Sequence, residues 1–131
     1  MLVESVMTQK NELVFVSPMA TVREALLKMK KHNIRSVIVD KTNESSGYGL
    51  LTFKNILQSI VAEDGDVDLL NVYDIAARPA ISVSRYLDVK YAAKMMIQNS
   101  IKRLIVSDNN EIYGLLTMTD IVEVIMDSME G

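Results

Sequence analysis

One pattern occurs twice in this chain, and the repetition limits the possible folds more than any other feature. The tetrapeptide Gly-Leu-Leu-Thr stands at 49–52 and again at 114–117, and the run at 34–39 returns as 101–106. Equivalent positions are 67 residues apart before the first polar turn and 65 after it, so the first copy has two extra residues in its turn. A supersecondary unit has therefore been duplicated within 131 residues.

Each copy is predicted to follow the order β-α-β-β-α. Alternating or β-branched runs predict strands, apolar residues at helical spacing predict helices, and Thr21 with Glu24 has the pattern of a capping box. The expected strands are 13–17, 37–39, 48–51, 81–83, 104–106 and 112–116. The expected helices are 22–31, 56–61, 89–96 and 121–125.

The two copies are expected at 1–62 and 72–131, joined by an acidic, solvated linker at 63–71. One copy has too few elements to cover its sheet, so the pair is expected to complete one core. The predicted fold class is α/β (α+β), with two pseudo-twofold-related repeats packed face to face as one module.

Composition narrows the function classes. Fourteen Lys and Arg against seventeen Asp and Glu give a net charge of −3, which argues against a non-specific nucleic-acid binder. The absence of cysteine excludes thiolate catalysis and Cys-bound metals, and the single histidine, His32, excludes multi-histidine metal sites. The acidic run at 64–68 has Leu69 where a calcium loop needs glycine, so no metal site is expected. No signal peptide or membrane span is evident, and we expect a cytoplasmic protein without a catalytic residue.

These repeated motifs resemble a tandem pair of cystathionine β-synthase (CBS) domains, also called a Bateman module. The resemblance rests on Val6-Met7-Thr8 before the first strand, on the two Ile-basic-x-aliphatic strands and on the two Gly-Leu-Leu-Thr turns. The run Thr-Met-Thr-Asp-Ile at 117–121 is similar to the family's entry into its last helix. The resemblance implies a non-catalytic regulatory module that binds an adenosine nucleotide in a cleft between its repeats.

By this resemblance, the Asp120 carboxylate would accept hydrogen bonds from a ribose diol, and the Thr117 hydroxyl would reach the ribose or phosphate. Lys102 and Arg103 would meet phosphate. The adenine would lie beside Thr8, between apolar walls that alignment of the copies assigns to Leu13, Ile34 and Leu115. A simple helix cap at Thr117, a solvated strand end at Lys102 and plain core residues are the alternatives.

The other cleft is predicted to be weaker, because Asn55 replaces the carboxylate, Ala77 replaces the hydroxyl and Arg35 is followed by Ser36. Lys54 is a candidate for compensating contact with phosphate. The residues assigned to this second cleft are Arg35, Leu50, Thr52, Asn55, Ala77, Ile81 and Ile101.

The expected ligands are AMP, ADP or ATP, ahead of S-adenosylmethionine, whose sulfonium is positive, and of NAD; no cofactor is expected. The wide apolar stripe on the last helix predicts a homodimer through helices, and output would pass to an effector protein in trans. The alternative function is a dimerisation or protein-interaction module with vestigial clefts. Neither nucleic acid nor membrane is an expected partner.

Overall fold

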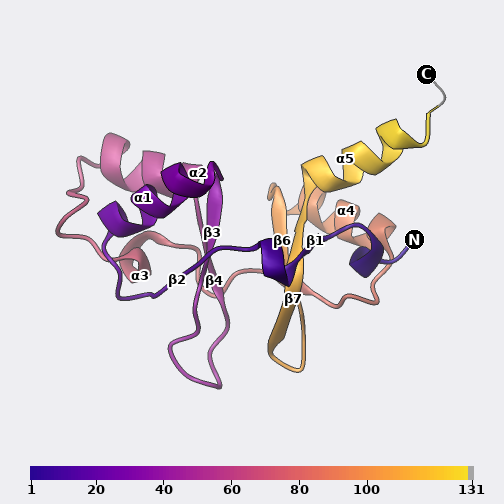
Figure 1. The fold of residues 1–131 in the computed structure, drawn as a ribbon, viewed down its shortest axis with the longest axis horizontal. Helices are drawn as coiled ribbons and strands as arrows, with labels where there is room; N and C mark the ends of the chain where they lie inside the picture. Colours follow the sequence, from indigo (N-terminus) through magenta and orange to yellow (C-terminus); the bar gives the residue numbers. More distant parts are fainter. Residues whose placement is uncertain (130–131) are drawn as a thin grey trace. The chain divides into compact units, whose positions relative to one another are not determined.

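Two hydrophobic cores organise the chain. A computed structural model describes residues 1–129 (Figure 1). The first unit combines residues 1–13 with the residues from Ile81 onward, and the second unit is the continuous segment Val14–Ala80. Each unit thus has a cluster of buried hydrophobic residues of its own. The units also divide the chain differently from the sequence repeats, because residues 1–13 pack with the second copy.

The second unit contains a three-stranded sheet in the order β2-β3-β4. Strands β2 and β3 are parallel, and β3 and β4 are antiparallel. A backbone bridge from Ala77 to Leu50 adds a further pairing to β4. The elements are β2 (Phe15–Val16), α1 (Val22–His32), β3 (Ser36–Val39), β4 (Gly49–Thr52), α2 (Phe53–Ile56), the π-helical η3 (Leu57–Ala62) and α3 (Val72–Ile75).

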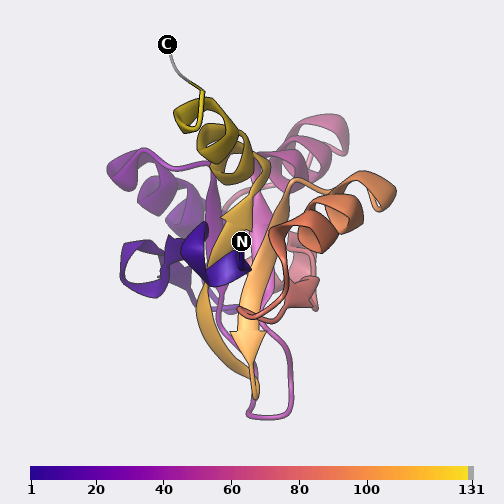
Figure 2. The ribbon, with the colours of Figure 1, turned by 90° about the vertical axis from the view of Figure 1, so that its right-hand side faces the viewer.

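The first unit contains a four-stranded sheet in the order β1-β7-β6-β5. Figure 2 shows β6 and β7 side by side, with α5 continuing directly from the end of β7. The elements are η1 (Val3–Ser5), β1 (Thr8–Gln9), η2 (Lys10–Glu12), β5 (Ser82–Val83), α4 (Val89–Gln98), β6 (Arg103–Asp108), β7 (Glu111–Thr117) and α5 (Met118–Asp127). Strand β1 comes from the opposite end of the chain and pairs antiparallel with β7.

The buried clusters of the two units are built from equivalent positions. The second unit buries Val16, Ala25, Met29, Val37, Val39, Leu51 and Val72. The first unit buries, in the same order, Val83, Ala92, Met96, Leu104, Val106, Leu116 and Val3. Fully burying one aliphatic side chain of this size contributes about 1.5–3 kcal/mol, so the duplicated apolar pattern accounts for both cores.

The predicted element types are confirmed, with three local corrections. The strand expected at 13–17 is reduced to Phe15–Val16, because Leu13 ends the preceding 3-10 turn and the Ser17 carbonyl accepts the turn bond from Ala20. The helix expected from Ile56 begins at Phe53 and continues as a π-helical turn. The Thr21 hydroxyl caps α1 by accepting from the Glu24 N–H, but within residues 1–129 the Glu24 carboxylate does not return the bond.

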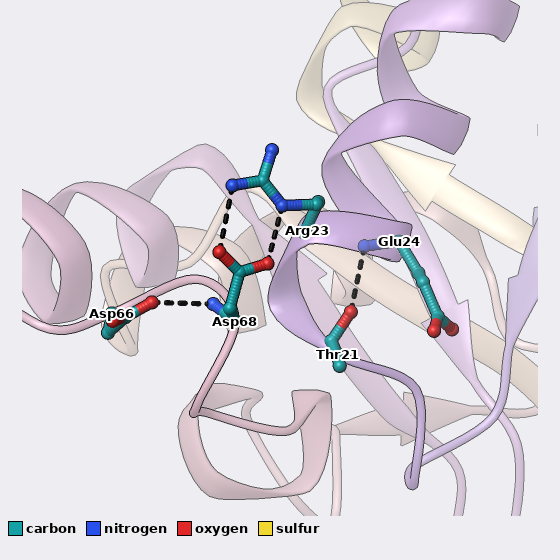
Figure 3. A network of polar contacts seen from close by, with 5 residues as sticks. All are labelled: Thr21, Arg23, Glu24, Asp66 and Asp68. Carbon is teal, nitrogen blue, oxygen red and sulfur yellow. Dashed lines mark hydrogen bonds and ion pairs between the residues drawn. The ribbon is translucent and has the colours of Figure 1, made fainter.

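The acidic linker packs on the start of α1 rather than standing free in solvent (Figure 3). The carbonyls of Leu70 and Val67 accept hydrogen bonds from the first two N–H groups of α1, which have no partner inside the helix. Arg23 donates from Nε to Asp68 Oδ1 at 2.5 Å and from Nη2 to Asp68 Oδ2 at 2.9 Å. The hydrogen bond from Arg23 holds the pKa of Asp68 below its usual value.

The close approach of β1 to β7 yields a stability prediction. A Cβ added at Gly114 would collide with the Thr8 carbonyl oxygen and lie 2.7 Å from the Met7 sulfur. We expect Gly114→Ala to lower the free energy of unfolding by about 1–3 kcal/mol, measured by urea denaturation. Gly47→Ala is the control, because a Cβ at Gly47 would meet only the Pro79 Cβ, at 3.0 Å, and no backbone atom. An equal or larger loss at Gly47 would contradict this account.

Candidate functional site

The turn from β7 into α5 carries a complete capping box in the first unit. The Asp120 N–H donates to Thr117 Oγ1 at 3.0 Å, and the Thr117 N–H donates to Asp120 Oδ2 at 3.0 Å. These two bonds satisfy backbone donors that a helix start leaves without partners. The cap also fixes the Asp120 side chain in one orientation.

A second donor reaches the Asp120 carboxylate from the N-terminal segment. Strand β1 pairs Thr8 with Leu115, and this register brings the Thr8 hydroxyl to 3.5 Å from Asp120 Oδ2. Within residues 1–129, Asp120 Oδ1 accepts no hydrogen bond. The half-buried carboxylate therefore keeps one oxygen fixed by the fold and offers the other as an acceptor.

Basic residues flank this turn on the neighbouring strand. Arg103 is the Cα partner of Thr117 in the β6–β7 ladder, and the Lys102 carbonyl accepts from the Met118 N–H at 3.0 Å. Lys102 is exposed and Arg103 is half-buried. The first unit thus brings together, from segments far apart in the sequence, the predicted residues Thr8, Lys102, Arg103, Leu115, Thr117 and Asp120.

The equivalent turn of the second unit has the same cap, with Asn55 in place of Asp120. Asn55 Oδ1 accepts from the Thr52 N–H at 2.9 Å and from the Thr52 hydroxyl at 3.0 Å. The other terminal atom of this side chain is the amide nitrogen, which donates to no described residue. Asn55 therefore presents a donor where Asp120 presents an acceptor.

Two further positions of the second unit also differ from their equivalents in the first unit. Ala77 bridges Leu50 as Thr8 pairs with Leu115, so it occupies the equivalent place without a hydroxyl. Ser36 is the Cα partner of Thr52, in the place that Arg103 has in the first unit, and Arg35 before it is exposed.

The predicted apolar wall residues have different surroundings. Leu115 is 6% exposed, and Leu13 is half-buried at the end of η2. Ile34 packs against the core of the second unit, and Ile101 packs against the core of the first. Ile81, at 42% exposure, is the most accessible of them. Their assignment to nucleotide walls stays a prediction.

Other classes of site were searched among residues 1–129. No group of three or more His, Asp or Glu side chains there could hold a metal ion. In the same part of the chain, every helix is too short or too polar to cross a membrane. His32 lies in the exposed last turn of α1, as its position before the helix end predicted. Sequence reasoning overlooked Arg78, which follows Ala77 and lines a pocket beside Tyr73.

The family model described as "CBS domain" matches this chain twice, at residues 3–62 and 72–127. The chain belongs to the CBS domain family. It is a CBS pair, and the tandem arrangement accounts for the duplicated turns and cores. Similar curated proteins include the uncharacterized protein MK0525 of Methanopyrus kandleri, which is 31% identical over 116 residues covering 88% of this chain and 59% of that protein. The CBS domain-containing protein YhcV of Bacillus subtilis is 26% identical over 87% of this chain and 79% of its own length.

Solved CBS structures share the fold over almost the whole chain. A hexameric CBS-CP12 protein from bloom-forming cyanobacteria superposes with a TM-score of 0.86 at 28% identity, covering 99% of this chain and 76% of that one. CBSX2, solved in complex with AMP, superposes with a TM-score of 0.83 at 19% identity, covering 98% of this chain and 99% of that one. The likeness to CBSX2 concerns the fold alone.

Proposed function

We propose that this CBS pair is a non-catalytic regulatory module that binds an adenosine nucleotide through the turn between β7 and α5. The supporting observation is the Asp120 carboxylate, which has one oxygen fixed by Thr8 and Thr117 and one oxygen without a described donor. A ribose offers two neighbouring hydroxyl donors, and an ordered carboxylate acceptor suits them without further rearrangement. Output would pass to an effector protein in trans, in the cytoplasm.

The charge around this turn favours a phosphate-bearing ligand. Lys102 and Arg103 flank Thr117, and cations beside a ribose acceptor match the charge separation of AMP, ADP or ATP. S-adenosylmethionine, with its positive sulfonium, and NAD fit this arrangement less well. The complex of the structural neighbour CBSX2 with AMP supports the same ligand class for this chain.

A thermal-shift assay, which measures Tm with and without ligand, tests this proposal directly. The full chain is heated with AMP, ADP, ATP, S-adenosylmethionine or NAD. A ligand present at 100 times its Kd stabilises the folded state by about 2.7 kcal/mol, so at least one adenine nucleotide should raise Tm clearly. An unchanged Tm with all five compounds would contradict nucleotide binding and favour a pure interaction module.

Substitutions in the two caps test the asymmetry between the units. We expect Asp120→Ala to weaken nucleotide binding by about 1.5–3 kcal/mol, the range for a hydrogen bond to a charged group, which is roughly ten- to over a hundredfold in Kd. Asn55→Ala should change Kd much less, because Asn55 presents a donor to the ligand side. Calorimetric titration measures both values.

Asp120→Asn separates ligand contact from helix capping. An asparagine can keep the cap as Asn55 does in the second unit, with its Oδ1 facing the Thr N–H. The ligand would then meet an amide donor instead of an acceptor. Loss of affinity with nearly unchanged Tm supports direct contact, whereas unchanged affinity would reduce Asp120 to a capping residue. Equal affinity losses at Asp120 and Asn55 would refute the asymmetry.

A second candidate function, association with another chain, is favoured by apolar side chains that the fold leaves exposed. None of the residues of α5 is buried, and Val122 and Met126 are 48% and 56% exposed. The equivalent residues of the second unit, Leu57 and Val61, are 61% and 63% exposed. Pairs at i and i+4 form a continuous helix face. We propose a second copy of this chain as the partner, because both repeats display the same pair.

The homodimer proposal predicts the effect of charge on this face. Val122→Glu together with Met126→Glu should shift the protein from dimer to the 14.7 kDa monomer in light scattering at micromolar concentration. The physical reason is that burying an unpaired carboxylate in an apolar contact is strongly unfavourable. Leu69→Glu is the control, because Leu69 is 81% exposed in the linker, and this variant should stay dimeric. A monomeric wild-type chain would contradict the proposal.

A further inference from the structure

A pocket of about 350 Å³ lies in the second unit between the end of the β3–β4 turn and the segment that follows α3. Its lining residues are Ser46, Gly47, Tyr73, Arg78 and Pro79. This volume falls within the range of small-ligand pockets, which is roughly 300–1,000 Å³. Tyr73 and Pro79 contribute apolar ring surface to its lining, and Arg78 supplies a cation.

The Arg78 guanidinium is held in place but lacks an anionic partner. Its central carbon lies 3.9 Å from the centroid of the Tyr73 ring, a cation–π contact that restricts the side chain. Its Nε is buried and has no hydrogen-bond partner. Within residues 1–129, no carboxylate forms an ion pair with Arg78. Arg78 therefore has neither a hydrogen bond to its buried Nε nor a carboxylate that compensates its charge.

Arg85 shows how the same chain holds a guanidinium for structural purposes. Arg85 also stacks on tyrosines, with its central carbon 4.7 Å from the Tyr86 ring and 3.8 Å from the Tyr113 ring. Its Nε is also buried without a hydrogen-bond partner, but it lies 3.5 Å from Asp108 Oδ2, so a carboxylate compensates its charge. Arg78 has the stacking and lacks the carboxylate, which marks it as a cation whose anion comes from another molecule.

The residues that line this pocket are not repeated in the first unit. The β1–β7 pairing and the Ala77–Leu50 bridge align Arg78 with Gln9 and Tyr73 with Glu4, so the first unit has neither the cation nor its ring. Gly47 aligns with Ile112. A Cβ at Gly47 would lie 3.0 Å from the Pro79 Cβ, so glycine keeps this side of the pocket open.

We propose that this pocket binds a small molecule that carries a carboxylate or phosphate group on a flat apolar body. A guanidinium can bind either oxyanion through two parallel N–H bonds, and the Tyr73 and Pro79 rings can contact the apolar part. The site uses neither Thr8 nor Asp120. It is therefore independent of the proposed nucleotide function.

The test follows the Arg78 Nε–Hε resonance of the ¹⁵N-labelled full chain during titration. The probes are sodium benzoate and phenyl phosphate, with benzamide as the uncharged control. Assignment comes from Arg78→Gln, which removes the signal. In the wild type we expect saturable shifts with at least one of the two anions and none with benzamide. The absence of saturation with both anions into the millimolar range, or an equal response to benzamide, would overturn the proposal.

Variants locate the binding and keep it distinct from the nucleotide site. Because Arg78→Gln removes the reporter signal, its affinity is read by calorimetry and should be at least tenfold weaker than that of the wild type. Gly47→Val should weaken binding while leaving the guanidinium present. Lys30→Gln, which removes an exposed cation of the same unit, and Asp120→Ala should leave benzoate or phenyl phosphate affinity unchanged. Loss of affinity in Lys30→Gln, or unchanged affinity in Arg78→Gln, would refute the assignment to this pocket.

Discussion

Val3 and Val72 have no exposed surface. Each of them packs in a core whose other residues belong, by sequence, to the other repeat. Val3 belongs by sequence to the first family match and packs in the core with the strands of the second. The residues that follow Val3 form β1, and this pairing brings Thr8 to the capping box of Asp120. The candidate site therefore depends on the burial of a valine five positions before its hydroxyl donor.

The two repeats share their apolar positions and differ at their polar ends. Equivalent residues fill both cores, and equivalent threonines cap α2 and α5. Beyond the caps, Asp120 presents an acceptor oxygen where Asn55 presents a donor nitrogen, and Gln9 stands at the position equivalent to Arg78. In both units the capping hydrogen bonds are formed and the core is filled by apolar side chains. The remaining polar atoms can therefore differ in chemistry without loss of the fold.

The sequence predicted the parts of this structure that rest on local or repeated patterns. The element order, the Thr117–Asp120 cap and the inequality between Asp120 and Asn55 followed from spacing, capping preferences and comparison of the copies. The packing of residues 1–13 with the second copy was not predictable in this way, because hydrophobic period shows which face is buried but not which segment covers it. Arg78 escaped notice for a related reason: an isolated arginine before a proline has no local signature, and its significance depends on Tyr73 and on the missing carboxylate.

The division of the chain also has a consequence for biosynthesis. The second unit is continuous from Val14 to Ala80, so all of its residues have been made once Ala80 leaves the ribosome. Residues 1–13 are made before the second unit, yet the β7 strand that pairs with them is completed only at Thr117. This segment therefore waits for its partner while the whole second unit is being made. Domains fold as their residues emerge, so the apolar side chain of Val3 remains available to chaperones or to other nascent chains throughout this interval.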